Sequence, residues 1–173
     1  MNIFVSHHSP IQSALFLDDK RANQMVRESG QLLSTAIREK TVYPPEGLYE
    51  SFNPNHPCAV WARSAPARFA WLMQHMDALL KRSRPEVHLR AREVLQVTST
   101  WFKANYFKFP RDGLLPFNNS AANKSLGVDF TRVDNTVLAY RTYLNYRWAH
   151  DEVTPTWKTG QKPDWFRDLG RKN

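Results

Sequence analysis

The sequence predicts a mainly α-helical fold: a compact single domain over residues 1–173 with about four to five helices. Two observations carry this prediction. Apolar residues recur at helical spacing in several long stretches, and prolines stand mainly where helices would begin or in the loops between them. In addition, 42% apolar and 13% aromatic residues argue against disorder. We expect a short extended segment at the N-terminus, two long ordered loops, and a tail (residues 151–173) packed on the core.

The first element in chain order is a β-prone segment, residues 2–6, which we expect to lie against the core. Ser9 then suits a helix N-cap and Pro10 suits the first helical position. A helix is expected to run from there to about Arg38, with a break near residues 18–19. Within it, an apolar stripe is centred on Met25.

The rest of the chain alternates between irregular and helical stretches. Four prolines and no periodicity predict an irregular connection over residues 41–64, and glycines, prolines and asparagines predict another over 105–131. Helical spacing predicts helices over about 66–83, from Pro85 through residue 102, and over 133–150. Tryptophans in the tail are expected to hold it on the core.

Charge and composition narrow the function classes. Lysine and arginine exceed aspartate and glutamate by eight, a balance that suits a polyanionic partner, with nucleic acid favoured over an anionic membrane surface. A basic protein without such a partner is the alternative. The single cysteine, Cys58, excludes an internal disulfide framework. Because the sequence shows no secretory signal and no membrane span, we expect a soluble, cytoplasmic protein.

Four polar residues of the first long helix form a row beside its apolar stripe. Arg21, Gln24, Glu28 and Gln31 stand at i, i+3, i+7 and i+10. A carboxylate at the edge of a buried face can stabilise positive charge that develops on a sugar, or activate water or an amine. Neighbouring arginines can hold phosphates. An ordinary solvated flank with one charge pair is the structural alternative.

Other sequence motifs give weaker indications of function. Basic and aromatic residues interleave between Trp101 and Arg111, which suits either a nucleic-acid surface with Lys103 and Arg111 on phosphates or a packed aromatic loop. Neither a phosphate-binding glycine loop nor metal-ligand spacing occurs, so we expect no cofactor and no metal. Cys58 and His56 lack an evident third partner for a cysteine nucleophile.

Several short motifs occur in the order found in one known family. They are Met1-Asn2-Ile3-Phe4, Arg27-Glu28, Asn55-His56-Pro57 and Pro155-Thr156-Trp157. In this order the chain resembles the pyrimidine-dimer DNA glycosylase (endonuclease V type) family of phages and bacteria. The resemblance covers roughly the first half of the chain and a patch of the tail.

The resemblance implies excision of a damaged pyrimidine from double-stranded DNA, with strand nicking through a Schiff base as a lyase step. Glu28 would be the catalytic carboxylate. The nucleic-acid contacts would come from two arginines of the same helix and from the region around the Asn-His-Pro motif, namely Arg21, Arg27, Asn55, His56, Trp61 and Arg63.

One departure from the family concerns the amine. Dimer-specific members use a free α-amine on a small second residue, whereas Asn2 is a poor substrate for Met1 removal. Lys20 is the nearest alternative amine, about 80° around the helix from Glu28, and Asp19 is the reserve catalyst. A glycosylase without lyase activity, an enzyme that modifies pyrimidines in DNA, and a non-catalytic DNA-binding module all stay open, as does the oligomeric state.

Overall fold

The structure, a computed structural model, describes residues 2–168 and confirms the mainly helical prediction. The helices are α1 (Pro10–Leu15), α2 (Asp19–Arg38), α3 (Pro57–Ser64), α4 (Pro66–Lys81), α5 (Leu89–Asn105) and α6 (Thr136–His150). Short 3-10 helices η1 (Tyr106–Lys108) and η2 (Lys124–Leu126) and an antiparallel pair of two-residue strands, β1 (Ala122–Asn123) and β2 (Val128–Asp129), complete the described elements.

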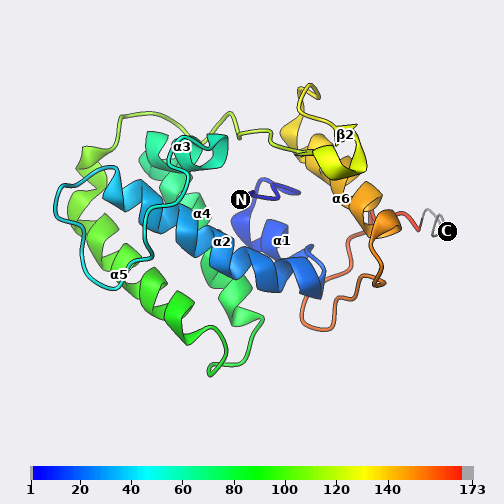
Figure 1. The fold of residues 1–173 in the computed structure, drawn as a ribbon, viewed down its shortest axis with the longest axis horizontal. Helices are drawn as coiled ribbons and strands as arrows, with labels where there is room; N and C mark the ends of the chain where they lie inside the picture. Colours follow the sequence, from blue (N-terminus) through cyan, green and yellow to red (C-terminus); the bar gives the residue numbers. More distant parts are fainter. Residues whose placement is uncertain (1, 169–173) are drawn as a thin grey trace.

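Helix α2 is the centre of the arrangement. It packs against α3, α4 and α5, while α6 lies at the opposite end of the molecule from α5 (Figure 1). The predicted break before α2 is confirmed, because Asp18 caps the helix by accepting a hydrogen bond from the backbone N–H of Arg21. Met25, Leu32 and Leu33 on the inner face are fully buried. Burial of each such side chain stabilises the fold by about 1.5–3 kcal/mol.

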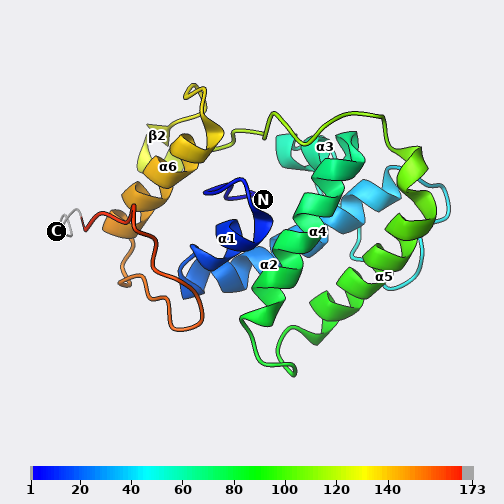
Figure 2. The same ribbon diagram turned by 180° about the vertical axis from the view of Figure 1, so that it is seen from behind.

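Helix α4 supplies the other half of the central layer. Seen from behind, it crosses α2 and leads through a turn into α5 (Figure 2). Phe69, Leu72, Met76 and Leu79 of α4 are buried in the same cluster as the inner face of α2. Side chains from α1, α3 and α6 join this cluster, so the described helices share one apolar core.

The N-terminal segment lies between α6 and the α2–α4 layer (Figures 1 and 2). Ile3 and Val5 are buried, as the expectation of a segment against the core requires. It is irregular rather than a strand: Ser13 of α1 donates a hydrogen bond to the carbonyl of Phe4, and Arg141 of α6 donates to that of Ser6. Side chains therefore satisfy backbone groups that a sheet would otherwise pair.

Two predicted boundaries are wrong. Residues 57–64 were expected to be irregular but form α3, which His56 caps by accepting a hydrogen bond from the backbone N–H of Cys58. Pro57 at its first turn lacks only an N–H that the helix would leave unpaired. The helix expected from Pro85 begins at Leu89, because His88 has a left-handed backbone with φ of 60°.

The loop between α2 and α3 lies directly on α2. A Cβ atom at Gly30 would stand 2.9 Å from the ring of Tyr49, so glycine at this position permits the close approach. Arg38 donates to the carbonyl of Tyr49, and Ser34 accepts from its backbone N–H. These bonds confirm that the loop is ordered, and they bring its next residues to the outer face of α2.

The described part of the tail packs on α6. Rings of Trp157, Trp165 and Phe166 surround Trp148, with centroid separations between 5.2 and 5.6 Å. The indole N–H of Trp157 donates to the carbonyl of Phe16, which ties the tail to the start of the chain as well. The tail thus contacts α6 and the start of the chain within the described range, and its last five residues lie outside that range.

Among helices of the described part, none combines the length and the apolar character needed to cross a membrane.

Candidate functional site

Glu28 stands near the middle of α2 and both of its carboxylate oxygens are engaged. Oε2 accepts a hydrogen bond of 2.7 Å from the backbone nitrogen of Asn2, and Oε1 accepts one of 2.6 Å from the amide of Gln24. The carboxylate is partly exposed, so it borders solvent as well as the N-terminal segment. The Glu28 carboxylate therefore lies within hydrogen-bonding distance of the backbone nitrogen of residue 2.

The side chain of Asn2 is held from the far end of the sequence. Tyr140 of α6 donates its phenolic O–H to Asn2 Oδ1 at 2.7 Å, and Asn2 Nδ2 donates to the carbonyl of Ser120 at 3.3 Å. Tyr140 also accepts from the backbone N–H of Ser120. Burial raises the pKa of Tyr140 well above its ordinary value, which keeps this phenol a donor. The position of Asn2 against Glu28 is thus fixed by three segments.

A hollow of about 630 Å³ opens beside Glu28 on the outer face of α2. We call it the Glu28 hollow; its lining residues are Asn23, Gln24, Arg27, Glu28 and Gln31 of α2, with Phe52 and His88. Its size is within the range of small-molecule sites in proteins. Three members of the predicted polar row, Gln24, Glu28 and Gln31, line this hollow together.

His56 lies close enough to Glu28 for the two to interact electrostatically. Burial lowers the pKa of His56, and the negative charge of Glu28 acts in the opposite direction. Its Nδ1 accepts a hydrogen bond from the backbone of Cys58, so the proton of the neutral ring is on Nε2. The structure thus brings His56 of the Asn-His-Pro motif and Glu28 into one region.

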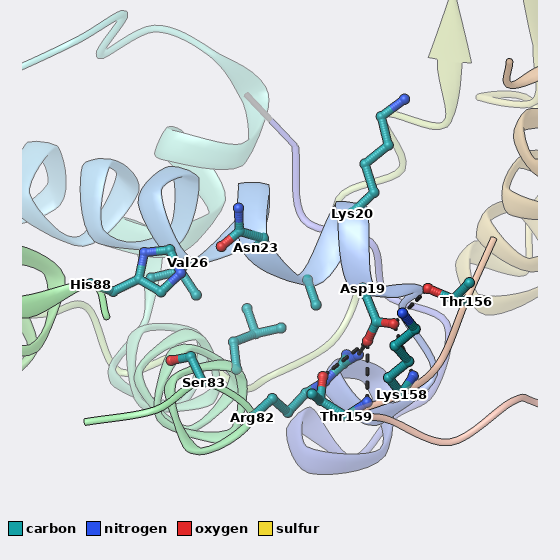
Figure 3. A pocket seen from close by; sticks show the side chains of 12 residues that line it. Asp19, Lys20, Asn23, Val26, Arg82, Ser83, His88, Thr156, Lys158 and Thr159 are labelled. Carbon is teal, nitrogen blue, oxygen red and sulfur yellow. Dashed lines mark hydrogen bonds and ion pairs between the residues drawn. The ribbon is translucent and has the colours of Figure 1, made fainter. Parts of the chain in front are cut away.

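Asp19 has a different environment from the one expected of a reserve catalyst. Its carboxylate accepts hydrogen bonds from Thr156, from the backbone of Lys158, and from both the backbone and side chain of Thr159, as Figure 3 shows. Arg82, the C-cap residue of α4, adds an ion pair of 3.3 Å. Every oxygen is occupied by a structural partner, so Asp19 clamps the tail to the start of α2.

These hydrogen bonds set the ionisation of Asp19. Partial burial by itself raises the pKa of the group, but the bonds from Thr156, Lys158 and Thr159 outweigh burial and lower the pKa to about 2. A general acid needs a proton near neutral pH, and this carboxylate holds none there.

Lys20, the expected alternative amine, does not join Glu28. It lines a separate hollow with Asp19, Arg82 and the tail, and its ammonium points away from the Asp19 cluster (Figure 3). We call this the Asp19 hollow. The two hollows share Asn23 and His88 in their linings, so they adjoin along α2. The nitrogen found at Glu28 is that of Asn2.

Two residues expected to contact nucleic acid are interior and correct the prediction. Arg21 is 3% exposed and forms ion pairs of 3.0 Å with Asp18 and 2.7 Å with Asp151. Trp61 is 6% exposed, and its indole N–H donates to the carbonyl of Pro116. Position 21 lies at the inner edge of α2, where the positive charge of Arg21 compensates the buried negative charge of the Asp18 cap.

The remaining expected contacts are distributed over the surface. Arg27 is exposed in the Glu28 hollow, and Asn55 is exposed one residue before the α3 cap. Arg63 donates to the carbonyl of Pro54 and thereby holds the loop before α3. Lys103 is exposed at a hollow between α4 and α5, and Arg111 in the loop after η1. The last two share no hollow with Glu28.

Within residues 2–168, no group of three or more histidine, cysteine, aspartate or glutamate side chains is arranged to hold a metal ion.

Two residues of the site, Phe52 and His88, carried no signal in the sequence, and Asn2 was singled out there only by the family resemblance. Asn2 reaches Glu28 across 26 positions of chain, and Phe52 and His88 come from separate loops. A lone phenylalanine in a proline-rich loop reads as an ordinary packing residue. Only the fold brings these side chains together.

Comparisons of the chain with protein-family models, with curated proteins and with solved structures found no match.

Proposed function

We propose that this protein is a DNA-processing enzyme, a pyrimidine-specific DNA N-glycosylase, with Glu28 as its catalytic carboxylate. The observation that carries the proposal is the 2.7 Å hydrogen bond between Glu28 and the nitrogen of Asn2, beside a hollow large enough for a nucleotide. An excess of eight basic residues over acidic ones supports a polyanionic substrate. Arg27 in the same hollow is suited to hold a phosphate.

The chemistry follows from the position of the carboxylate. When the bond between C1′ of the sugar and the base breaks, the base leaves with the electron pair and positive charge develops on the sugar. A carboxylate beside that sugar stabilises the charge electrostatically. The leaving base takes up a proton from water.

The nitrogen of Asn2 decides between two forms of the reaction. If Met1 is removed, this nitrogen is an α-amine that can attack C1′ as the bond from C1′ to the base breaks, and it then loses a proton to Glu28. Opening of the sugar ring, with that proton passing from Glu28 to O4′, gives the iminium that allows strand nicking. If Met1 is retained, the nitrogen is an amide, which is not a nucleophile, and water completes a simple base excision.

Incubation with an ultraviolet-irradiated duplex tests the proposal. We expect release of damaged pyrimidines, and none from the same duplex without irradiation. Borohydride would trap the iminium, and mass spectrometry of the N-terminus would report whether Met1 is present. The absence of both base release and a trapped adduct would contradict the proposal. Intact DNA with a modified base would instead indicate a base-modifying enzyme.

A further inference from the structure

The ring of Phe52 is the most unusual feature of the Glu28 hollow. It is 58% exposed, and among residues 2–168 no other ring is paired with it. Trp101 and Phe109 of the basic and aromatic segment are buried in ring clusters, in contrast. An aromatic ring is therefore presented at the Glu28 hollow.

The backbone that carries this ring is held firmly to α2. The N–H of Phe52 donates to the hydroxyl of Thr35 at 3.2 Å, and the amide of Gln31 donates to the carbonyl of Glu50. Arg38 donates to the carbonyl of Tyr49 and pairs with the Glu50 carboxylate. The loop is thus tied to α2 at Tyr49, at Glu50 and at the backbone of Phe52 itself, while the ring of Phe52 stays uncovered.

Polar groups suited to a heterocycle surround the ring. Gln24 and Gln31 each use their NH₂ group within the protein, to Glu28 and to Glu50. Neither amide oxygen receives a hydrogen bond from the described chain, so both remain acceptors for N–H groups of a ligand. Arg27 adds a positive charge on the same lining.

We propose that Phe52 is the stacking surface for a single unstacked nucleobase of DNA, whose edge faces the amide oxygens of Gln24 and Gln31 while Arg27 meets an adjoining phosphate. The proposal rests on the proposed function and names how its substrate is recognised. Aromatic stacking tolerates any base, whereas the amide oxygens accept from N–H groups on a base edge. The hollow of about 630 Å³ has room for a nucleotide.

The test is equilibrium binding of the full chain at fixed salt to two matched duplexes. One carries a single bulged thymine, and the other carries a tetrahydrofuran abasic analogue at the same place. We expect wild-type protein to prefer the bulged thymine by roughly tenfold, which is the scale of one base stacked on an aromatic ring. Phe52→Ala should remove this preference without weakening binding to the abasic duplex, and Phe52→Tyr should restore it.

A matched control is Phe107→Ala, because Phe107 is 70% exposed on η1 and lies outside the Glu28 hollow. It should keep the full preference. The assignment would be overturned if Phe52→Ala retained the preference for the bulged thymine. It would also be overturned if Phe52→Ala and Phe107→Ala reduced binding to both duplexes equally. Absence of binding to either duplex would overturn it together with the proposed function.

The readout separates the two proposals because it needs no chemistry. If the protein prefers the bulged thymine through Phe52 but releases no base, the stacking site is supported and the proposed glycosylase activity is contradicted. If the protein releases base but its Phe52→Ala variant keeps the preference for the bulged thymine, the glycosylase activity is supported and the stacking site is contradicted.

Discussion

Two carboxylates on the same helix have opposite surroundings. Asp19, in the first turn of α2, accepts four bonds from the tail and one from Arg82, the C-cap residue of α4, and has no free oxygen (Figure 3). Glu28, further along the helix, accepts one bond from its own helix and one from the nitrogen of Asn2, and borders an open hollow. The first holds segments of the protein together, and the second can be reached by a ligand.

The comparison teaches that the partners of a carboxylate, and not its place on a helix, decide what it can do. The donors that the tail supplies to Asp19 lie 137 to 140 residues further along the chain, and those bonds lower the pKa of Asp19 to about 2. A carboxylate whose oxygens all accept hydrogen bonds from the protein stabilises the fold but is not available to react with a ligand. Four changes should break or sharpen the contrast.

The largest effect is expected for Asp19→Ala. The change leaves the buried end of Arg82 without its carboxylate and removes the acceptor for Thr156 and Thr159. We expect the free energy of unfolding to fall by about 2–3 kcal/mol. Chemical denaturation measures this fall, and limited proteolysis should show earlier cleavage of the tail. Base release per folded molecule should be unchanged; a selective loss of that rate would place Asp19 in the catalytic site after all.

Tyr140→Phe should have a smaller effect on stability and a distinct effect on rate. It removes the O–H that holds Asn2 against Glu28 and leaves the backbone N–H of Ser120 without its acceptor. We expect a loss of about 1 kcal/mol in unfolding free energy and a fall of about tenfold in base release, because Tyr140 positions Asn2 against Glu28. As a control, Tyr143→Phe alters a neighbouring ring of α6 that has no bond to Asn2 and should spare the rate.

Acid should narrow the stability gap between wild type and Asp19→Asn. The pKa of Asp19 is lowered in the folded state, so its contribution is complete above pH 3.8, the ordinary value, and is lost as pH falls towards 2. Solvent screens this partly exposed group, so we expect the gap to shrink by about 1 kcal/mol over that window. Urea denaturation of both proteins at pH 6 and pH 2 measures it. A gap independent of pH would mean that Asp19 is not held as the anion.

The smallest effect concerns two exposed cations of α2. Arg27 lines the Glu28 hollow and Lys20 lines the Asp19 hollow. Arg27→Ala should weaken DNA binding a few-fold and reduce the salt slope by about one unit, as the loss of one phosphate contact predicts. Lys20→Ala should leave any borohydride adduct intact. Disappearance of the adduct in Lys20→Ala would make that lysine the amine.

Local signals in the sequence predicted much of the fold. Ser9, Pro10 and the helical spacing around Met25 located α1 and α2, because caps and periodicity are local properties. Helix α3 was missed because a stretch that follows several prolines gives a weak periodic signal over only eight residues. The late start of α5 depends on the left-handed backbone of His88, which is rare for that residue type.

The site was predictable only in part. The polar row identified Glu28 with Gln24 and Gln31, but the same spacing also included Arg21, which the buried Asp18 draws inward. Asn2 bonds Glu28 from a distant part of the chain, and Phe52 lines the same hollow as Glu28 from the loop before α3; no local pattern encodes such an arrangement. Whether a carboxylate of α2 is saturated with hydrogen bonds, like Asp19, or open to a hollow, like Glu28, depends on the segments that pack beside it.

The most direct test compares base release from an ultraviolet-irradiated duplex by Glu28→Gln and Asp19→Asn under single-turnover conditions. If Glu28 is the catalytic carboxylate, Glu28→Gln should lower the rate by about 10²- to 10⁴-fold while its unfolding free energy stays within about 0.5 kcal/mol of wild type. Asp19→Asn should show the reverse, a wild-type rate per folded molecule with reduced stability. A Glu28→Gln protein that releases base at the wild-type rate would contradict the account.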